Sequence, residues 1–481
     1  MMKLADTVSN ILWTSEDAAR ATGGDAHTQW RATGVSINTR TLKPGDLFIA
    51  LQGPNVDGHD YVSAAFEKGA AAAAVCHRPP VLDPDAPLLV IDDTMKALEA
   101  LGRTARERLD HAKVIAVTGS VGKTGTKEAL KLVLSQQGKT SASEGSLNNH
   151  WGLPLSLART PADADFAILE MGMNHPGELV PLSQMAKPDV CVITTIAPAH
   201  TEFFSGPEEI ADAKAEIFKG AVPGAVAVLN CDIKEFDRLS TAAKAAGVSK
   251  VITFGGGMGA DFRLMNCVLH ADVSDVKAMT PLGEIVYRLG VPGRHWVMNS
   301  LCVLAAVHAA DGDILRGCES LSRLTAPIGR GQHFEITLGD GQFLLIDESY
   351  NASPAAMRAA MAVLGAQRVS HGGRRIAVLG DMLELGDETP DLHAALVEAL
   401  SDNAVDLVFL AGEAMVHLWD VMPEDMRGYH CITSDLLVDV VRQAVRPGDV
   451  VMVKGSAGAR MGRVVEALKS LNPSQQNQGG A

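Results

Sequence analysis

The chain has 481 residues, which at ordinary domain sizes corresponds to about three domains. Its 42 Lys and Arg residues are outnumbered by 57 Asp and Glu residues, and the net charge of −15 argues against general binding to nucleic acid or to anionic membranes. Aromatic residues are only 4% of the total, which argues against stacking platforms for single-stranded nucleic acid.

The cysteine pattern and the hydropathy indicate a cytoplasmic protein. Seven cysteines, an odd number, are scattered without a C-x-x-C pair, as in proteins of a reducing compartment that lack a zinc site. The N-terminal residues MMKLADTVSN lack the apolar core of a signal peptide, and no run of about 20 apolar residues occurs. We therefore expect no membrane insertion, and a monomer is the default expectation.

The first predicted domain, residues 1–111, alternates short strands with helices. It contains GVSINTRTLKPGDLFIAL, GHDYVSAAFEKGAAAAAV and PLLVID. This alternation indicates a small α/β domain.

The second predicted domain, residues 112–325, contains strands that are apolar along their whole length. Such strands, when they alternate with helices, indicate a parallel sheet that is covered on both faces. The predicted elements are the strand VIAVTG (114–119), a helix over 123–136, and strands over 166–172, 189–196 and 225–230.

The third predicted domain, residues 326–481, has strands over 343–348, 375–380, 406–412 and 449–455. This pattern indicates a second doubly wound, Rossmann-like unit. The segment 324–335 contains a proline and two glycines and is the predicted hinge between the two larger domains. The predicted fold class is therefore α/β with three domains: an N-terminal α/β domain, a central parallel-sheet domain with a phosphate loop, and a C-terminal Rossmann-like domain.

Residues 114–130, VIAVTGSVGKTGTKEAL, combine an apolar strand, a glycine-rich turn and the start of a helix. Backbone N–H groups of such a turn, followed by a helix N-terminus, form a cradle for phosphate oxygens. In that cradle Lys123 would reach the terminal phosphates and the Thr124 hydroxyl would bind Mg²⁺. Val117 replaces the first glycine of the common G-x-x-x-x-G-K-[ST] loop, and the alternative is an ordinary strand-to-helix turn.

The short loop T-G-S-V-G-K-T-x-T-K-E resembles the ATP loop of the Mur ligases, the amide-forming enzymes that build the peptidoglycan stem peptide. In that family the loop reads T-G-T-N-G-K-T or a close variant, and Gly125 stands where Ser or Thr is usual. The resemblance implies that ATP is bound by Gly119, Ser120, Val121, Gly122, Lys123 and Thr124.

Further segments extend the resemblance over nearly the whole chain. They are TRTLKPGDLFIALQGPNVDGHDYV (39–62), SEGSLNNHWGLPLSL (143–157), ILEMGMNHPGEL (168–179), ITTIAPAHTEFFSGPEEIADAKAEIF (193–218), GRHWVMNSLCVLAA (293–306), DESYNASPAAM (347–357) and VLGDMLELG (378–386). The first and the last two are most similar to the branch that adds D-Ala-D-Ala to UDP-N-acetylmuramoyl-tripeptide. The implied reaction is ATP-dependent amide formation through an acyl phosphate, in peptidoglycan and cell-wall synthesis.

The resemblance also implies a site for two Mg²⁺ ions. Its ligands would be Thr124, Glu170, His200 and Lys214, and the last three, with Lys123, are the implied catalytic residues. Glu170 ends an apolar strand at the sheet edge where ligands bind, although a surface glutamate is the alternative. For His200 the resemblance carries the assignment, because a single histidine is more often structural. In several family members the lysine at the place of Lys214 is carbamylated, and we hypothesise the same here, with a solvated helix lysine as the alternative.

The remaining implied contacts are with ATP and the two other substrates. Arg330 resembles a hinge arginine that reaches the ATP phosphates, Asp347 resembles an acid that binds the ribose, and Asn299 would contact adenine. Trp296 follows His295, where the family often has Asn. The implied binding residues for the UDP-linked tripeptide and for D-Ala-D-Ala are Thr39, Arg40, Gly58, His59, Asn148, Asn149, Tyr350, Asn351, Ser353, Lys454 and Ser456.

Four other functions remain as alternatives. The branch of the family that adds the third residue carries a D-N-P-[RK] motif, which is absent here, and folylpolyglutamate synthetase lacks an N-terminal UDP-binding block of this type. An ATP-gated switch would not need Glu170, His200 and Lys214 together. A simple kinase would release a phosphorylated product instead of free phosphate, so the dependence of ATP turnover on both an acid and an amine identifies a ligase.

Overall fold

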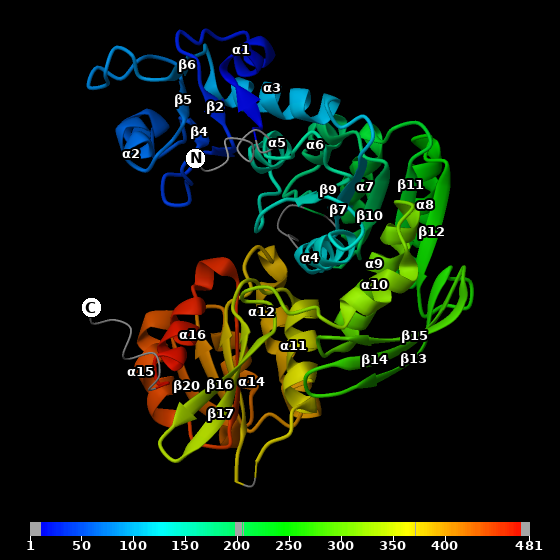
Figure 1. Cartoon of the computed structure of the whole chain (residues 1–481). Coiled ribbons are helices and arrows are strands. Elements are labelled where there is room, and N and C mark those ends of the chain that lie inside the picture. The colour runs from blue at the N-terminus through cyan, green and yellow to red at the C-terminus, as the bar shows by residue number, and fades with distance from the viewer. Residues whose placement is uncertain (1–10, 198–203, 205, 371, 473–481) are drawn as a thin grey trace, which may run out of the picture.

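The structure is a computed structural model that describes residues 11–197, 204, 206–370 and 372–472. The chain forms three α/β domains along a curve, with the N-terminal domain (blue) and the C-terminal domain (yellow to red) at the two ends and the central domain (cyan to green) between them (Figure 1). Each domain has its own sheet with mostly parallel strands. The predicted α/β fold class with three domains is therefore confirmed.

The N-terminal domain contains a sheet of four parallel strands in the order β3-β4-β5-β6. Its strands are β3 (Gly34–Ser36), β4 (Asp46–Ile49), β5 (Ala72–Val75) and β6 (Leu88–Val90), and its helices are α1 (Ser15–Thr22), η1 (Gly58–Tyr61), α2 (Val62–Glu67) and α3 (Thr94–Glu107). Two further strands, β1 (Trp13–Thr14) and β2 (Arg31–Ala32), pair antiparallel with each other. The inner strands β4 and β5 are buried along their whole length, as expected of parallel strands that are covered on both faces.

The central domain is built on one nine-stranded sheet in the order β15-β14-β13-β12-β11-β10-β7-β9-β8. Its strands are β7 (Lys113–Thr118), β8 (Thr140–Ala142), β9 (Phe166–Glu170), β10 (Val190–Ile193), β11 (Val226–Asn230), β12 (Lys250–Gly255), β13 (Phe262–Leu269), β14 (Ser274–Thr280) and β15 (Gly283–Leu289). Its helices are α4 (Lys123–Leu134), α5 (Gly152–Ala158), α6 (Leu179–Ala186), α7 (Pro207–Ala215), η2 (Glu216–Gly220), α8 (Phe236–Ala245), α9 (Arg294–Ala309) and α10 (Ile314–Leu321). Alternate strand residues enter two cores, one beneath α4, α9 and α10 and the other beneath α5 to α8.

The prediction of a wholly parallel sheet is wrong for one edge of the central sheet. There β13, β14 and β15 form an antiparallel meander, which the sequence pattern does not indicate. Along β14 and β15 every second residue is buried against the core beneath α9 and α10, whereas the residues between them are partly or fully exposed. A strand of this kind lacks the continuous apolar run that identifies a parallel strand, so it escapes a search for such runs.

The C-terminal domain contains a six-stranded sheet in the order β16-β17-β21-β18-β19-β20, with only the β16–β17 pair antiparallel. Its strands are β16 (Gln332–Leu338), β17 (Gly341–Glu348), β18 (Arg375–Gly380), β19 (Leu407–Ala411), β20 (Arg427–Cys431) and β21 (Val450–Lys454). Its helices are α11 (Pro354–Ala366), η3 (Gly386–Glu388), α12 (Thr389–Ala394), α13 (Leu396–Asp402), α14 (Val416–Val421), η4 (Glu424–Met426), α15 (Ser434–Ala444), η5 (Ala457–Ala459) and α16 (Gly462–Lys469). The predicted hinge at 324–335 follows α10 and runs into β16.

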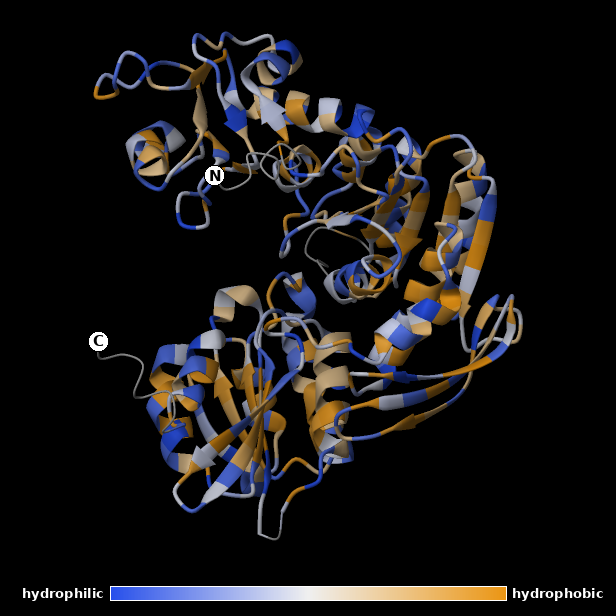
Figure 2. Ribbon diagram, viewed as in Figure 1, coloured by the Kyte–Doolittle hydropathy of each residue, from blue (hydrophilic) through white to orange (hydrophobic). Residues whose placement is uncertain are grey.

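Hydrophobic residues (orange) concentrate in the strands of the two larger sheets, while the helices that cover them carry hydrophilic residues as well (Figure 2). This distribution matches the buried strand residues of the central and C-terminal cores. In the part of the chain that the structure describes, no helix has the length and apolar character that crossing a bilayer requires.

Candidate active site around the phosphate loop

The phosphate loop runs from the end of β7 to the start of α4 and bends sharply at two glycines. Gly119 has φ 147° and Gly122 has φ 87°, a region that residues with a side chain rarely adopt. A Cβ atom on Gly119 would lie 1.9 Å from the Oγ1 atom of Thr194, and one on Gly122 would lie 3.0 Å from the Oδ1 atom of Asn299. Glycine is therefore required twice, and the second glycine brings the loop against Asn299 of α9.

Lys123 is the first residue of α4, and its ammonium group lies folded over the loop. Its Nζ donates to the carbonyl oxygens of Gly119 at 2.7 Å and Ser120 at 3.4 Å. Burial lowers the pKa of Lys123, the nearby carboxylate of Glu170 raises it, and the guanidinium of Arg330 lowers it. The ammonium group and the N-terminus of α4 thus lie together at the loop, where the loop pattern predicts an anion cradle.

Glu170 is the last residue of β9, which pairs with β7, and its side chain is buried with 1% exposure. Its Oε1 atom accepts a hydrogen bond of 2.8 Å from Nδ2 of Asn148, while Oε2 is buried and has no hydrogen-bond partner among the described residues. A buried carboxylate oxygen without a partner is costly unless a cation or a donor group binds to it. The site at Glu170 therefore fits a bound Mg²⁺ ion.

Lys214 lies on α7 and is buried, with 2% exposure. The alternative of a solvated helix lysine is therefore wrong. Burial, and next the positive charge of Lys123, hold the pKa of Lys214 well below its usual value. Among the described residues, the Nζ atom of Lys214 takes part in no hydrogen bond or ion pair.

The predicted metal ligands are only partly placed by the structure. Thr124 lies buried in the first turn of α4. The charge of Glu170 raises the pKa of Lys123, and the charge of Lys123 lowers the pKa of Lys214. His200 lies outside the described residues. Within the described ranges, no three His, Cys, Asp or Glu side chains come together as a metal site, so the metal assignment remains a prediction.

The C-terminal domain contributes Arg330 and Tyr350 to the same region. The guanidinium carbon of Arg330 lies 4.3 Å from the ring centroid of Tyr350, a cation–π geometry. The Tyr350 hydroxyl is hydrogen bonded to the hydroxyl of Ser146 in the central domain. The positive charge of Arg330 lowers the pKa of Lys123, so this predicted hinge arginine acts electrostatically on the phosphate loop.

Other predicted residues of the C-terminal domain have local partners. Asp347 Oδ1 accepts hydrogen bonds from the Ser349 backbone at 3.1 Å and from its hydroxyl at 2.6 Å. Lys454 Nζ forms an ion pair of 3.0 Å with Glu348 and donates to the Asn351 carbonyl at 3.0 Å.

Two predicted serines have structural contacts of their own. Ser353 caps α11 by accepting from the Ala356 N–H at 3.4 Å, and the Ser456 hydroxyl accepts from the Leu383 N–H at 3.0 Å. These bonds shape the loops around the site, and the binding roles of both serines remain predictions.

In the N-terminal domain, Thr39 and Arg40 lie in the loop between β3 and β4, and Gly58 and His59 begin η1. Arg40 N–H donates to Oδ1 of Asn38 at 2.9 Å, and the Thr39 carbonyl accepts from Lys68 Nζ at 2.8 Å. A Cβ on Gly58 would lie 2.7 Å from backbone atoms of Ala50 and Leu51, so only glycine fits there.

Both ring nitrogens of His59 are already engaged. Nδ1 lies 2.6 Å from Oδ1 of Asp57, and Nε2 accepts from the Cys76 N–H at 2.9 Å. The ring also stacks on His77 with centroids 4.6 Å apart. His59 therefore fixes the loop conformation, and its predicted contact with the substrate remains untested.

Two departures from the family pattern, Gly125 and Trp296, contact each other. A Cβ on Gly125 would lie 2.8 Å from Cη2 of Trp296, whose side chain is buried at 5% exposure in the core beneath α9. The indole thus occupies the space of the Ser or Thr that the family usually has at position 125. The contact joins residues far apart in the chain, so neither departure by itself indicates the other in the sequence.

We expect Gly125→Thr to lower the free energy of unfolding by about 1–3 kcal/mol, because the added atoms overpack the contact with Trp296. Trp296→Asn alone should also be destabilising, since it empties a large buried volume. The double variant Gly125→Thr/Trp296→Asn should be more stable than the sum of the two losses predicts. Denaturant unfolding of the four proteins measures this coupling, and strictly additive losses would contradict the contact.

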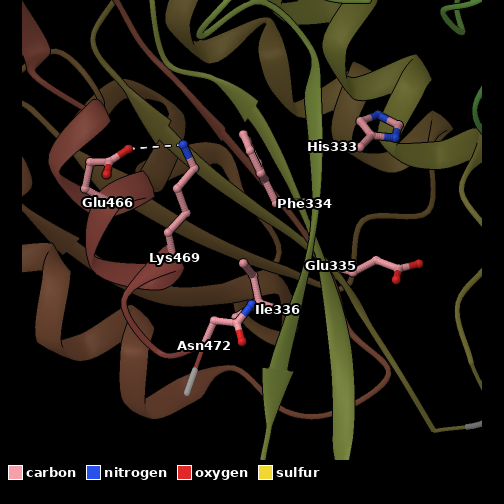
Figure 3. Close-up of a pocket in the computed structure, with 7 residues that line it drawn as sticks. All are labelled: His333, Phe334, Glu335, Ile336, Glu466, Lys469 and Asn472. Carbon is pink, nitrogen blue, oxygen red and sulfur yellow. Dashed lines mark hydrogen bonds and ion pairs between the residues drawn. The ribbon is translucent and has the colours of Figure 1, made fainter. Parts of the chain in front are cut away.

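A separate pocket lies on the C-terminal domain between β16 and α16 (Figure 3). There Lys469 forms an ion pair of 3.1 Å with Glu466, and its Nζ lies 4.0 Å from the centroid of the Phe334 ring. None of the residues predicted from the sequence lines this pocket, so the candidate site is the phosphate-loop region.

Comparisons with known proteins agree with the geometry. Three family models match successive parts of the chain: the Mur ligase family catalytic domain at residues 31–108, the Mur ligase middle domain at 117–307, and the Mur ligase glutamate ligase domain at 330–457. The UDP-N-acetylmuramoyl-tripeptide--D-alanyl-D-alanine ligase of Rickettsia prowazekii is 32% identical over 459 residues, which are 95% of this chain and 99% of the relative.

Solved structures are similar over most of the chain. A crystal structure of MurF from Acinetobacter baumannii has a TM-score of 0.80 and 30% identity, and the match covers 95% of this chain and 99% of that chain. A MurF ligase from Thermotoga maritima in complex with ADP has a TM-score of 0.73 and 26% identity, with 92% and 98% covered.

Proposed function

This chain belongs to the Mur ligase family, and we propose that it is the ligase that adds D-Ala-D-Ala to UDP-N-acetylmuramoyl-tripeptide. The products are UDP-N-acetylmuramoyl-pentapeptide, ADP and phosphate, as peptidoglycan synthesis requires. The observation that supports this function best is that the charges of Glu170 and Arg330 act on Lys123 at the phosphate loop, and that the charge of Lys123 acts on the buried Lys214. The names of the relatives favour this substrate pair over that of the branch that adds the third residue.

The reaction joins a carboxylate to an amine at the expense of ATP. A carboxylate oxygen of the tripeptide attacks the γ-phosphorus of ATP, the bond to ADP breaks, and an acyl phosphate forms. The amine of D-Ala-D-Ala then attacks the acyl carbon, loses a proton, and phosphate leaves with the former carboxylate oxygen.

The first step brings an anion against a polyanion, and positive charge must offset the repulsion. Two like charges about 4 Å apart repel by roughly 4 kcal/mol at an effective dielectric constant near 20. Lys123 and Arg330 would supply positive charge that offsets this repulsion. Mg²⁺, when bound, would add Lewis-acid stabilisation of the phosphate oxygens.

We assign the residues of the site as follows. ATP would contact Gly119, Ser120, Val121, Gly122, Lys123, Thr124, Asn299, Arg330 and Asp347. Two Mg²⁺ ions would be held by Thr124, Glu170, His200 and Lys214. The UDP-linked peptide and D-Ala-D-Ala would contact Thr39, Arg40, Gly58, His59, Asn148, Asn149, Tyr350, Asn351, Ser353, Lys454 and Ser456. These assignments are supported by the family motifs and by the cluster at Lys123.

We also propose the domain boundaries 1–111, 112–325 and 326–481 for the parts that bind the UDP-linked substrate, bind ATP and complete the site. Each of the three main sheets falls within one of these ranges. A cytoplasmic location is supported by the seven free cysteines and by the need for ATP.

Lys214 is proposed to carry a carbamate, formed when its neutral amine attacks CO₂ and loses a proton. The modification would convert a buried amine, which has no partner among the described residues and whose pKa is lowered by burial and by the charge of Lys123, into an anion that binds a cation. Lys214→Met should reduce kcat by roughly 100-fold. Intact-protein mass spectrometry at raised bicarbonate should detect the carbamate in the wild type and not in this variant. Full activity of Lys214→Met would show that the residue has no such role.

The proposed function is tested by measuring phosphate release and product formation with ATP, Mg²⁺, UDP-N-acetylmuramoyl-tripeptide and D-Ala-D-Ala, with one component omitted at a time. Release that needs every component, together with a UDP-linked pentapeptide, is expected. ATP hydrolysis without either substrate would favour a switch. A phosphorylated product without free phosphate would favour a kinase.

A further inference from the structure

Lys127 lies one turn after Lys123 on α4, and its side chain is completely buried, with 0% exposure. An ammonium group has three N–H donors. All three find acceptors: the carbonyl oxygen of Ser143 at 2.7 Å, the carbonyl oxygen of Gly145 at 2.8 Å, and Oε1 of Glu128 at 2.7 Å. Burying an ammonium costs several kcal/mol before its partners offset the loss, so general stability is a weak reason for this arrangement.

Residues 143–149, which Lys127 contacts, are also hydrogen bonded to Glu170 of the candidate site and to Tyr350 of the C-terminal domain. Asn148 Nδ2 donates to Oε1 of Glu170 at 2.8 Å, and Ser143 Oγ accepts from the Glu170 N–H at 3.3 Å. Farther along the segment, Ser146 is hydrogen bonded to the hydroxyl of Tyr350 in the C-terminal domain.

Other contacts of the same segment reach the N-terminal domain. Arg159 Nη1 forms an ion pair of 2.7 Å with Glu144, and Nε of the same arginine donates to the Val35 carbonyl in β3 at 2.6 Å. The 143–149 segment thus contacts groups that are linked to all three domains. The ammonium group of Lys127 connects this segment directly to α4, the helix that follows the phosphate loop.

We propose that Lys127 is a positioning residue that fixes the 143–149 segment, and with it Asn148, relative to the phosphate loop. The proposal rests on the proposed function, in which Asn148 and Asn149 face the UDP-linked peptide and Lys123 faces ATP. Lys127 does not contact either substrate in this role. Instead, Lys127 sets the distance between the tripeptide carboxylate and the γ-phosphate of ATP. Small errors in that distance slow the reaction strongly.

The test compares Lys127→Met, which keeps the length of the side chain and removes all three donors, with Lys127→Gln, which keeps two donors on a shorter chain. Lys131→Met is the matched control, because Lys131 is exposed on the same helix. Steady-state kinetics gives kcat and the KM values for ATP and for UDP-N-acetylmuramoyl-tripeptide. Deuterium exchange without substrates reports on the backbone amides of residues 143–149 and of α4.

We expect Lys127→Met to raise the KM for the UDP-linked tripeptide by roughly tenfold or more and to lower kcat, with the KM for ATP changed by less than about twofold. Exchange should accelerate in residues 143–149 and stay unchanged in α4. Lys127→Gln should fall between Lys127→Met and the wild type, and it carries the same test if Lys127→Met does not fold. Lys131→Met should behave as the wild type.

Two results would overturn the proposal. One is an unchanged KM for the UDP-linked tripeptide together with wild-type exchange in residues 143–149. The other is a parallel change of both KM values with faster exchange throughout the central domain, which would indicate a purely structural role. A wild-type protein that makes no UDP-linked pentapeptide would instead contradict the proposed function, and the exchange measurement would still decide whether Lys127 holds the segment.

Discussion

Lys123→Met is expected to lower kcat/KM for ligation by roughly 1,000-fold, the largest effect of any single substitution at the site. The ammonium of Lys123 is the proposed charge that meets the ATP phosphates, because Lys123 begins α4 and its Nζ lies over the carbonyl groups of Gly119 and Ser120. Methionine retains the apolar part of the side chain and removes only the charge and the donors. Steady-state kinetics measures the loss, with the ATP concentration varied below its KM and the other two substrates saturating.

The fold should survive this change. Lys123 loses one good internal hydrogen bond, to the Gly119 carbonyl, so the free energy of unfolding should fall by about 1 kcal/mol. Circular dichroism and denaturant unfolding check this expectation. An exposed lysine far from the loop, Lys250, provides the matched control as Lys250→Met. Activity of Lys123→Met within a few fold of the wild type would contradict the placement of ATP at this loop.

Glu170→Gln is expected to lower kcat by roughly 100-fold or more and to raise the Mg²⁺ concentration needed for half-maximal activity. The substitution keeps the side-chain shape, and an amide oxygen can still accept the hydrogen bond from Asn148. It removes the negative charge and the buried Oε2 atom, which has no hydrogen-bond partner in the part of the chain that the structure describes. A titration of activity against Mg²⁺ measures both effects.

The melting temperature of Glu170→Gln distinguishes a loss of Mg²⁺ binding from a loss of folding. Since the wild-type carboxylate is buried and one of its oxygens is unpaired within the described ranges, its neutral replacement should leave the melting temperature unchanged or raise it. Glu413→Gln changes an exposed glutamate of the C-terminal domain and should affect neither property. Wild-type activity with unaltered Mg²⁺ dependence in Glu170→Gln would remove Glu170 from the metal site.

Much of the fold could be predicted because its causes are local. The strands β9, β18 and β21 contain continuous apolar residues, and a parallel strand covered on both faces needs that composition. The phosphate loop is equally local, since Gly119 and Gly122 are fixed by the backbone conformation of a strand-to-helix turn. The meander β13–β15 could not be predicted in this way, because its strands are buried on one face only.

The residues of the candidate site could be named only from the family resemblance. Their burial and their contacts could be read only from the structure. The sequence by itself determined the loop, the strand that ends at Glu170 and the order of the α/β units, because backbone conformation and periodicity act over a few residues. Only the tertiary structure decided that Lys214 is buried beside Lys123, that Trp296 fills the space next to Gly125, and that Lys127 holds residues 143–149. Those relations join residues far apart in the chain, and burial and charge proximity are properties of the packed molecule rather than of any segment.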